Sequence, residues 1–210
     1  MTARTRVKIC GITRPEDGLC AALAGADAIG LVFYRPSPRA VDLETARAIT
    51  AVLPPFVTRV GLFVDADQGE VASVLNSIPL DMLQFHGNET PAECARYAIP
   101  YIKAVRMAED VDLRAQAGLY ASAAGLLVDS YIPGIAGGTG RTFDWGRIPA
   151  DTGKPVVLAG GLTPDNVCRA IASVRPYAVD VSGGVEADRG VKDPALIRSF
   201  IEQVGSCRHE

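Results

Sequence analysis

The chain has few of the residues that hold metal ions. Among 210 residues there are two histidines and five cysteines, and one of the histidines, His209, lies in the C-terminal tail. The cysteines are odd in number and scattered, without a Cys-x-x-Cys pair, which argues against a zinc site and against a disulfide framework. We expect no metal site, and we interpret Cys20, Cys94 and Cys168 as small apolar packing residues of helices. Cys10 differs, because it ends the first apolar run.

Long apolar runs and a strong excess of charge are also missing. No stretch approaches the roughly 18 residues that a membrane-spanning helix needs. The basic N-terminal residues are not followed by the apolar core of a secretory signal. The formal net charge of −3 gives no electrostatic reason for binding nucleic acid or an anionic membrane. We therefore expect a cytoplasmic protein with neither as a partner.

Short apolar segments recur along the whole chain. Most are continuously apolar rather than alternating, which is typical of parallel strands covered on both faces. We predict eight strands: Val7–Cys10, Ala28–Phe33, Arg59–Phe63, Met82–His86, Tyr101–Val105, Gly125–Ser130, Pro155–Gly160 and Ala178–Gly184.

Helix signals separate most of these strands. Thr13 is predicted to cap a helix that has Pro15 in its first turn, and Asp42 to cap the next. Thr163 and Pro164 repeat the pattern later in the chain, whereas the sixth unit offers only the short stretch "FDWGRI". Eight βα units without a linker predict a single (β/α)8 TIM barrel over residues 1–210. A doubly wound sheet is the alternative, but no Gly-x-Gly-x-x-Gly motif follows the first strand.

Polar residues at the strand ends are the candidates for an active site, because the carboxyl ends of barrel strands line it. Ser37 and Arg39 follow the second strand. The strand-end candidates are Cys10, Gln84, His86, Asp129, Gly160, Gly161 and Asp180, with the Ser182-Gly183-Gly184 turn after Asp180.

The glycine pairs after the seventh and eighth strands indicate a phosphate site. An anion held by main-chain N–H groups needs close approach, which side chains other than glycine obstruct. Two tight turns without a ligand are the alternative.

Cys10 and Asp129 suggest proton transfer. A thiolate at a strand end accepts a proton, and a carboxyl group in a partly closed pocket donates one. The alternatives are a small strand residue for Cys10 and a loop cap for Asp129. His86 is interpreted as a polar contact at the barrel rim. Arg39 is either a surface charge or a fork for a carboxylate.

Seven motifs together resemble the phosphoribosylanthranilate isomerase family of tryptophan biosynthesis. They cover nearly the whole chain: "KICGIT", "FYRPSPR", "QFHG", "LLVDS", "GGTGRTFDW", "LAGGLTPDNV" and "AVDVSGGVE". The resemblance implies a barrel enzyme without cofactor or metal. Its small-molecule substrate would be N-(5-phosphoribosyl)anthranilate, which it would convert to the 1-deoxyribulose 5-phosphate ketone by an Amadori rearrangement. We expect a monomer or a homodimer.

The same resemblance implies roles for individual residues. Cys10 would be the general base at C2 of the ribose, and Asp129 the general acid at the ring oxygen. Arg39 would bind the anthranilate carboxylate, and Asp180 the ribose hydroxyls. Gln84 and His86 are expected to contact substrate, and Gly160, Gly161, Ser182, Gly183 and Gly184 to bind its phosphate.

Two further expectations concern loops. The glycine-rich stretch 133–140 would be a mobile flap over the substrate. The family usually has serine where this chain has Gly183, which removes one hydroxyl contact to phosphate.

A histidine-pathway isomerase is the alternative function, but its members have aspartate at the position of Cys10. A non-catalytic phosphate binder would not need Cys10, Asp129 and Arg39 together.

Overall fold

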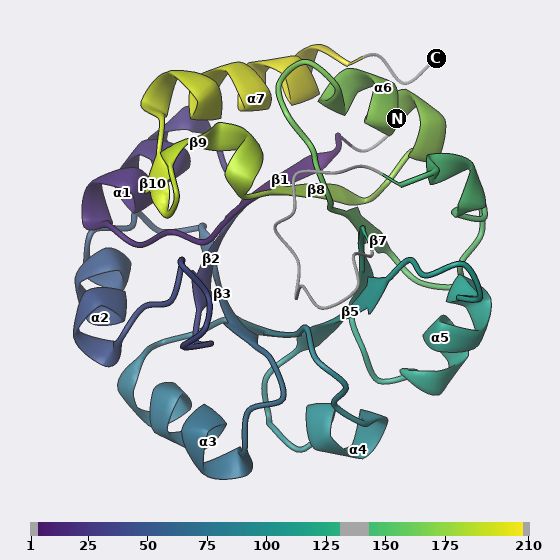
Figure 1. Ribbon diagram of the computed structural model, residues 1–210. Helices are drawn as coiled ribbons and strands as arrows, with labels where there is room; N and C mark the ends of the chain where they lie inside the picture. The colour runs from purple at the N-terminus through teal and green to yellow at the C-terminus, as the bar shows by residue number, and fades with distance from the viewer. Residues whose placement is uncertain (1–3, 131–142, 208–210) are drawn as a thin grey trace.

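In the computed structural model, which describes residues 4–130 and 143–207, parallel strands close into a ring with helices around it (Figure 1). All eight predicted strands are present, paired in sequence order, and β8 pairs with β1 to close the barrel. They are β1 Arg6–Cys10, β2 Ala28–Val32, β3 Thr58–Phe63, β4 Met82–Phe85, β5 Tyr101–Arg106, β6 Gly125–Asp129, β7 Val156–Leu158 and β8 Ala178–Val181. The (β/α)8 prediction is thereby confirmed.

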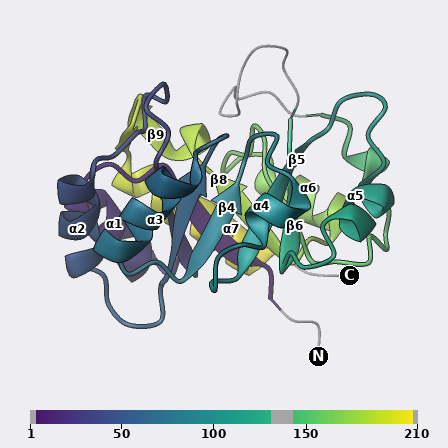
Figure 2. The same cartoon turned by 90° about the horizontal axis from the view of Figure 1, so that it is seen from below.

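Helices cover the outside of the barrel, as the side view shows (Figure 2). They are α1 Pro15–Ala24, α2 Leu43–Ala51, α3 Gln68–Ser77, α4 Pro91–Cys94, α5 Leu113–Leu119, α6 Val167–Val174 and α7 Pro194–Ser206. Between β6 and β7 the described residues form only the short 3-10 helix η1, Trp145–Arg147. A second 3-10 helix, η2 Gly183–Val185, follows β8 and leads into the hairpin of β9 Glu186–Asp188 and β10 Val191–Lys192.

A helix usually begins just after a side chain that accepts hydrogen bonds from the unpaired main-chain N–H groups of its first turn. Asp42 caps α2 as predicted, accepting from the Thr45 N–H. The prediction for Thr13 is wrong: α1 begins at Pro15, and the Thr13 hydroxyl donates instead to the Gly190 carbonyl. The start predicted at Thr163 is also too early, since α6 begins at Val167. The Asn166 side chain just before it accepts from the Thr163 N–H and donates to the Gly161 carbonyl.

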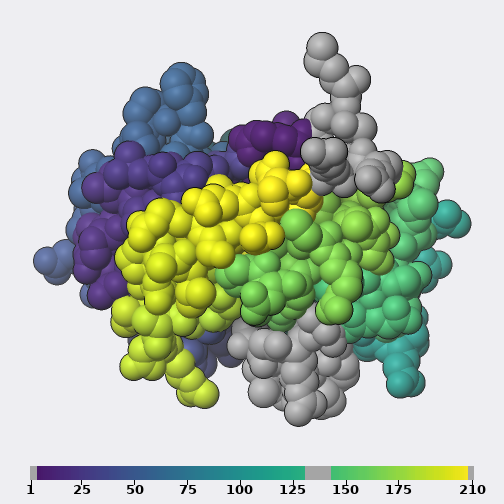
Figure 3. Space-filling model, turned by 90° about the horizontal axis from the view of Figure 1, so that it is seen from above, coloured from purple at the N-terminus to yellow at the C-terminus, as the bar shows by residue number. Residues whose placement is uncertain are grey.

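The last helix, α7, lies across the seam of the barrel between α1 and α6 (yellow in Figure 3). A disulfide joins Cys168 of α6 to Cys207 just after α7, with their Cα atoms 5.5 Å apart. The interpretation of Cys168 as a packing residue is therefore wrong. Residues 39 positions apart meet because α6 and α7 pack side by side.

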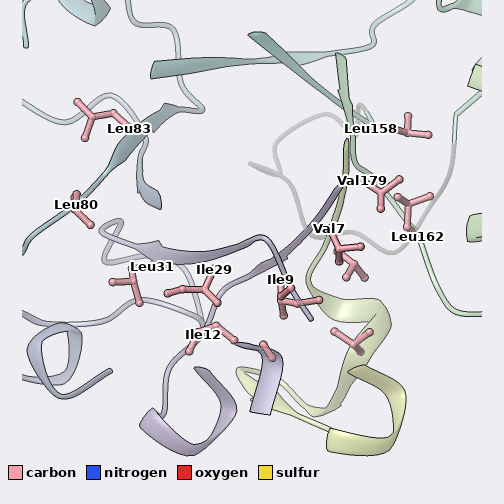
Figure 4. Close-up of a cluster of buried hydrophobic side chains, with 14 of the residues drawn as sticks. Val7, Ile9, Ile12, Ile29, Leu31, Leu80, Leu83, Leu158, Leu162 and Val179 are labelled. Atoms are coloured by element: carbon pink, nitrogen blue, oxygen red, sulfur yellow. The ribbon is translucent and has the colours of Figure 1, made fainter. Parts of the chain in front are cut away.

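Strand side chains divide between two apolar regions. Outward-facing residues such as Val7, Ile9, Ile29 and Leu31 are buried against the helices (Figure 4). Inward-facing residues of β5 to β8 fill the barrel, among them Leu127 and Val157. This alternation sends Lys8 and Cys10 to the inside, since residues two apart share a face. In the described part of the chain, no helix is long and apolar enough to cross a membrane.

Candidate active site

A cavity of about 580 Å³ opens at the carboxyl ends of the strands. Every residue predicted for the site lines it: Cys10, Arg39, Gln84, His86, Asp129, Gly160, Gly161, Asp180, Ser182, Gly183 and Gly184. The predicted flap, 133–140, lies outside the described residues. Among the described residues, no group of three or more His, Cys, Asp or Glu side chains is arranged to hold a metal ion.

Cys10 is almost completely buried and lies beside an ion pair. Lys8 Nζ donates to Asp180 Oδ1 at 2.8 Å, and both side chains are nearly inaccessible to solvent. Burial raises the pKa of the Cys10 thiol, while the Lys8 ammonium acts in the opposite direction. For Lys8, burial alone would lower the pKa, but Asp180 and Cys10 outweigh it and raise the pKa. The pair joins β1 to β8, whose Lys8 and Asp180 are also in register.

Asp129 lies at the end of a chain of three polar side chains. Its Oδ1 accepts from the Ser130 N–H at 2.8 Å, and its Oδ2 lies 3.3 Å from His86 Nε2. On the other side of the ring, Gln84 Nε2 is 3.0 Å from His86 Nδ1. An amide donor at Nδ1 leaves the ring proton of a neutral histidine on Nε2, the nitrogen that faces Asp129.

Arg39 forms a bidentate ion pair with a carboxylate of its own chain. Its Nε and Nη2 each donate to Glu186 at 2.7 Å, and Lys192 Nζ donates to the same carboxylate at 2.9 Å. Burial alone would raise the pKa of Glu186, but the hydrogen bonds and charges of Arg39 and Lys192 outweigh it and lower that pKa. The guanidinium fork of Arg39 thus has Glu186 as its partner, whereas the predicted partner is the carboxylate of the substrate.

The glycines after β7 and β8 permit close packing of two loops. Gly160 and Gly161 have positive φ angles of 85° and 64°. A Cβ on Gly160 would lie 2.6 Å from the Ser130 nitrogen, and one on Gly184 would lie 1.9 Å from the Leu162 carbonyl oxygen. At these two positions glycine is required by contact between neighbouring loops, whether or not an anion is bound.

A second buried ion pair supports the loop that carries His86. Lys103 Nζ donates to Glu89 at 2.9 Å and to the Gly87 carbonyl at 2.7 Å, while Glu89 accepts from the Asp65 and Gly87 N–H groups. Arg106 Nη2 donates to the His86 carbonyl at 2.7 Å. These contacts fix the main chain just after β4, and therefore the direction of the imidazole.

The sequence patterns single out neither Lys8 nor Glu186 nor Lys192. Lys8 had a usable signal: a charged residue two positions before Cys10, on the same face of an otherwise apolar strand. Glu186 and Lys192 had none, because their partners come from the loop after β2 and from the hairpin after β8.

Comparisons with known proteins agree on one family. The family model described as N-(5'phosphoribosyl)anthranilate (PRA) isomerase matches residues 7–203. The chain is 59% identical over 205 residues to N-(5'-phosphoribosyl)anthranilate isomerase of Pseudomonas aeruginosa (strain UCBPP-PA14), covering 98% of this chain and 97% of that protein.

Two solved structures extend the similarity to the fold. A monomeric form made from the dimeric phosphoribosylanthranilate isomerase of Thermotoga maritima is 40% identical with a TM-score of 0.85, covering 96% of this chain and 98% of that chain. A phosphoribosyl anthranilate isomerase in complex with reduced 1-(o-carboxyphenylamino)-1-deoxyribulose 5-phosphate is 41% identical, with the same TM-score of 0.85 and the same coverage of 96% and 98%.

Proposed function

Because the chain belongs to the N-(5'-phosphoribosyl)anthranilate isomerase family and catalyses that Amadori rearrangement in tryptophan biosynthesis, we propose which residues carry out the reaction. The observation that carries the proposal is the placing of a thiol and a carboxyl group, Cys10 and Asp129, on different strands around one cavity. The reaction needs a base at C2 of the ribose and an acid at the ring oxygen. These two groups supply both.

Asp129 acts first, as the general acid. It protonates the ring oxygen while the bond from that oxygen to C1 breaks, and the lone pair of the anthranilate nitrogen forms the C1–N double bond. Cys10, as thiolate, then removes the proton from C2, and the electrons of that C–H bond neutralise the iminium nitrogen. The enol-amine so formed tautomerises to the ketone. No redox partner is needed, because C1 is reduced as C2 is oxidised.

His86 serves Asp129. With Gln84 donating to Nδ1, the imidazole presents Nε2–H toward Asp129 Oδ2 across 3.3 Å. This contact does not meet the geometry of a hydrogen bond, but it holds the imidazole directly beside the carboxyl group at the cavity. Gln84 and His86 therefore support the acid in addition to lining the substrate cavity.

The remaining site residues bind the two ends of the substrate. Arg39 is the partner of the anthranilate carboxylate, since Glu186 engages its Nε and Nη2 and leaves Nη1 for the ligand. Asp180, held by Lys8, contacts the ribose hydroxyls. The phosphate is bound by the main chain around Gly160, Gly161 and Ser182–Gly184, after the two strands where barrels commonly bind phosphate. The solved relative in complex with reduced product supports a ligand of this class.

The experiment that tests these roles follows the loss of phosphoribosylanthranilate fluorescence with purified protein. We expect Cys10→Ala and Asp129→Asn to lower kcat by about 10²–10⁴-fold, as loss of a general base or acid usually does, with little change in KM. A folded variant of either kind with near-normal kcat removes that residue from the mechanism. Cys20→Ala, a thiol outside the cavity, is the matched control.

We also propose a homodimer formed through the loop between α2 and β3. Phe56 in this loop is fully exposed with a positive φ of 70°, which displays a large apolar ring to solvent. The hollow that Phe56 helps to line has apolar residues (Leu53, Pro54, Pro55, Val57) on one part and polar ones (Thr50, Thr58, Arg59, Asp81) on the rest, so one surface offers a projecting ring and a recess of mixed polarity. Such a surface suits an isologous pair. Sedimentation should show a dimer that Phe56→Ser converts to monomer, whereas a monomeric wild-type protein contradicts this.

A further inference from the structure

A buried ammonium group lies two residues before the proposed base. Lys8 and Cys10 are both on the inner face of β1, where the side chain of Lys8 is 6% exposed. A lysine so deeply buried is uncommon unless it is paired. Its ion pair with Asp180 accounts for its charge but not for its position inside the barrel beside a thiol.

Gly30 makes the room for this arrangement. In the parallel pairing of β1 and β2, Gly30 stands opposite Cys10. A Cβ on Gly30 would lie 2.8 Å from Cys10 Sγ and 3.1 Å from Lys8 Nζ. The sulfur and the ammonium nitrogen therefore border the same small space, on the side of β1 that faces the cavity.

Four charged groups from different elements act on the Cys10 sulfur. Lys8 from β1 and Lys192 from β10 favour the thiolate, and Arg39 after β2 interacts with it favourably as well. Asp180 from β8 opposes it. Lys8 has the largest favourable influence on the sulfur. These interactions oppose the burial, which is the largest influence and leaves the pKa of the Cys10 thiol above its ordinary value.

We propose that Lys8 activates Cys10: its ammonium is the counter-ion of the Cys10 thiolate, and Asp180 and the space above Gly30 hold it there. The proposal rests on the role of Cys10 as base. Lys8 is a positioning residue and keeps its own proton throughout. The thiol proton leaves through the cavity before the substrate enters, and the sulfur then takes the C2 proton.

The test measures the thiolate directly and requires no turnover. In a Cys20→Ala/Cys94→Ala background the free thiol is Cys10, because the remaining two cysteines form the disulfide. The rate of alkylation by iodoacetamide is followed against pH in the wild-type background, Lys8→Met and Lys8→Arg. We expect Lys8→Met to raise the midpoint by about one to three pH units, so that the thiolate fraction at pH 7 falls at least tenfold. Lys8→Arg should recover most of this shift.

Further variants separate the charge of Lys8 from its surroundings. Lys8→Met leaves Asp180 unpaired, so Lys8→Met/Asp180→Asn removes both charges, and its midpoint should still exceed that of the wild type. Asp180→Asn alone should lower the midpoint. Lys192→Met should raise it less than Lys8→Met does. Lys103→Met, which removes a buried paired lysine elsewhere, should leave it unchanged.

An unchanged midpoint in Lys8→Met, or in the double variant if the single one does not fold, overturns the proposal. The proposal is also overturned if Lys103→Met raises the midpoint as much as Lys8→Met does. A Cys10→Ala variant with full activity would instead contradict the role of Cys10 as base. A raised midpoint in Lys8→Met would then still show the effect of Lys8 on the thiol, so the two failures are distinguishable.

Discussion

The guanidinium of Arg39 and the carboxylate of Glu186 meet as two planar forks, with Nε and Nη2 each 2.7 Å from a carboxylate oxygen. The two residues are 147 positions apart and nearly buried. Because one fork occupies two of the three guanidinium nitrogens, Glu186 fixes the plane of Arg39 at the rim of the cavity. Lys192 holds Glu186 from the other side.

This relationship predicts that Glu186 acts on substrate binding through Arg39. Arg39→Ala should raise KM strongly. The loss of substrate-binding free energy should be roughly 2–5 kcal/mol if the pair between Arg39 and the substrate carboxylate is buried. Arg39→Lys should not restore it, since an ammonium group cannot form the fork. Glu186→Gln should raise KM less than Arg39→Ala, with kcat nearly unchanged. Steady-state kinetics check both, and an unchanged KM in Arg39→Ala would leave Arg39 with a structural role only.

The lowered pKa of Glu186 predicts a loss of stability in acid. A carboxyl group whose pKa is lower in the folded than in the unfolded chain stabilises the fold above its unfolded value, here near 4.5, and loses that contribution as the pH falls through the folded pKa. Glu186→Gln should therefore flatten the fall in unfolding free energy below about pH 4.5. Urea unfolding of both proteins from pH 7 to pH 3 measures this. Parallel curves would contradict it.

Two adjacent glycines predict opposite outcomes. Gly183 has no positive φ angle, and a Cβ there would approach Arg39 Nη2 no closer than 3.3 Å. Gly183→Ser should therefore fold and stay active, with KM unchanged or lowered by about tenfold at most. Gly184→Ala places its Cβ 1.9 Å from a main-chain oxygen, so it should lose about 1–3 kcal/mol or more of unfolding free energy. A well-folded Gly184→Ala, or an inactive Gly183→Ser, would contradict this description of the turn.

The disulfide between Cys168 and Cys207 predicts a stability that depends on redox conditions. Closing a loop of 39 residues should add about 2–4 kcal/mol to the unfolding free energy. Dithiothreitol should lower the urea midpoint of the wild type and leave that of Cys168→Ala/Cys207→Ala unchanged. Equal wild-type midpoints with and without the reductant would show that the bond does not form.

Local patterns predicted more of the barrel than of its contacts. Continuous apolar runs located all eight strands, because burial on both faces leaves a mark within a few residues. Helix starts depended on more than the local sequence: Thr13 has the chemistry of a cap, but its hydroxyl donates to the Gly190 carbonyl, which is distant in sequence. Cys168 appeared as a packing residue for the same reason, since its partner is set by how α6 and α7 pack.

The site was predictable to the extent that topology brings strand ends together. Cys10, Asp129 and Asp180 line one cavity because parallel strands end on one side of the barrel. The side chain that pairs with each site residue depends on the folded geometry, which spacing along the sequence does not reveal. Lys8 with Asp180 and Arg39 with Glu186 are pairs between distant elements, and both charged partners of Glu186 could be assigned only from the folded chain.

Closure of the ring by β1 and β8 has a consequence for synthesis of the chain. Lys8 and Asp180 are 172 residues apart, so at 5–20 residues per second the ribosome delivers the second on the order of ten to thirty seconds after the first. During that interval β1 has one unpaired edge, and Lys8 has no carboxylate to accompany it into the barrel. Exposed strand edges pair readily with other chains. A chain that stops before β8 is therefore a candidate for aggregation and chaperone capture. It should also be inactive, because it lacks Asp180 and the Ser182–Gly184 turn.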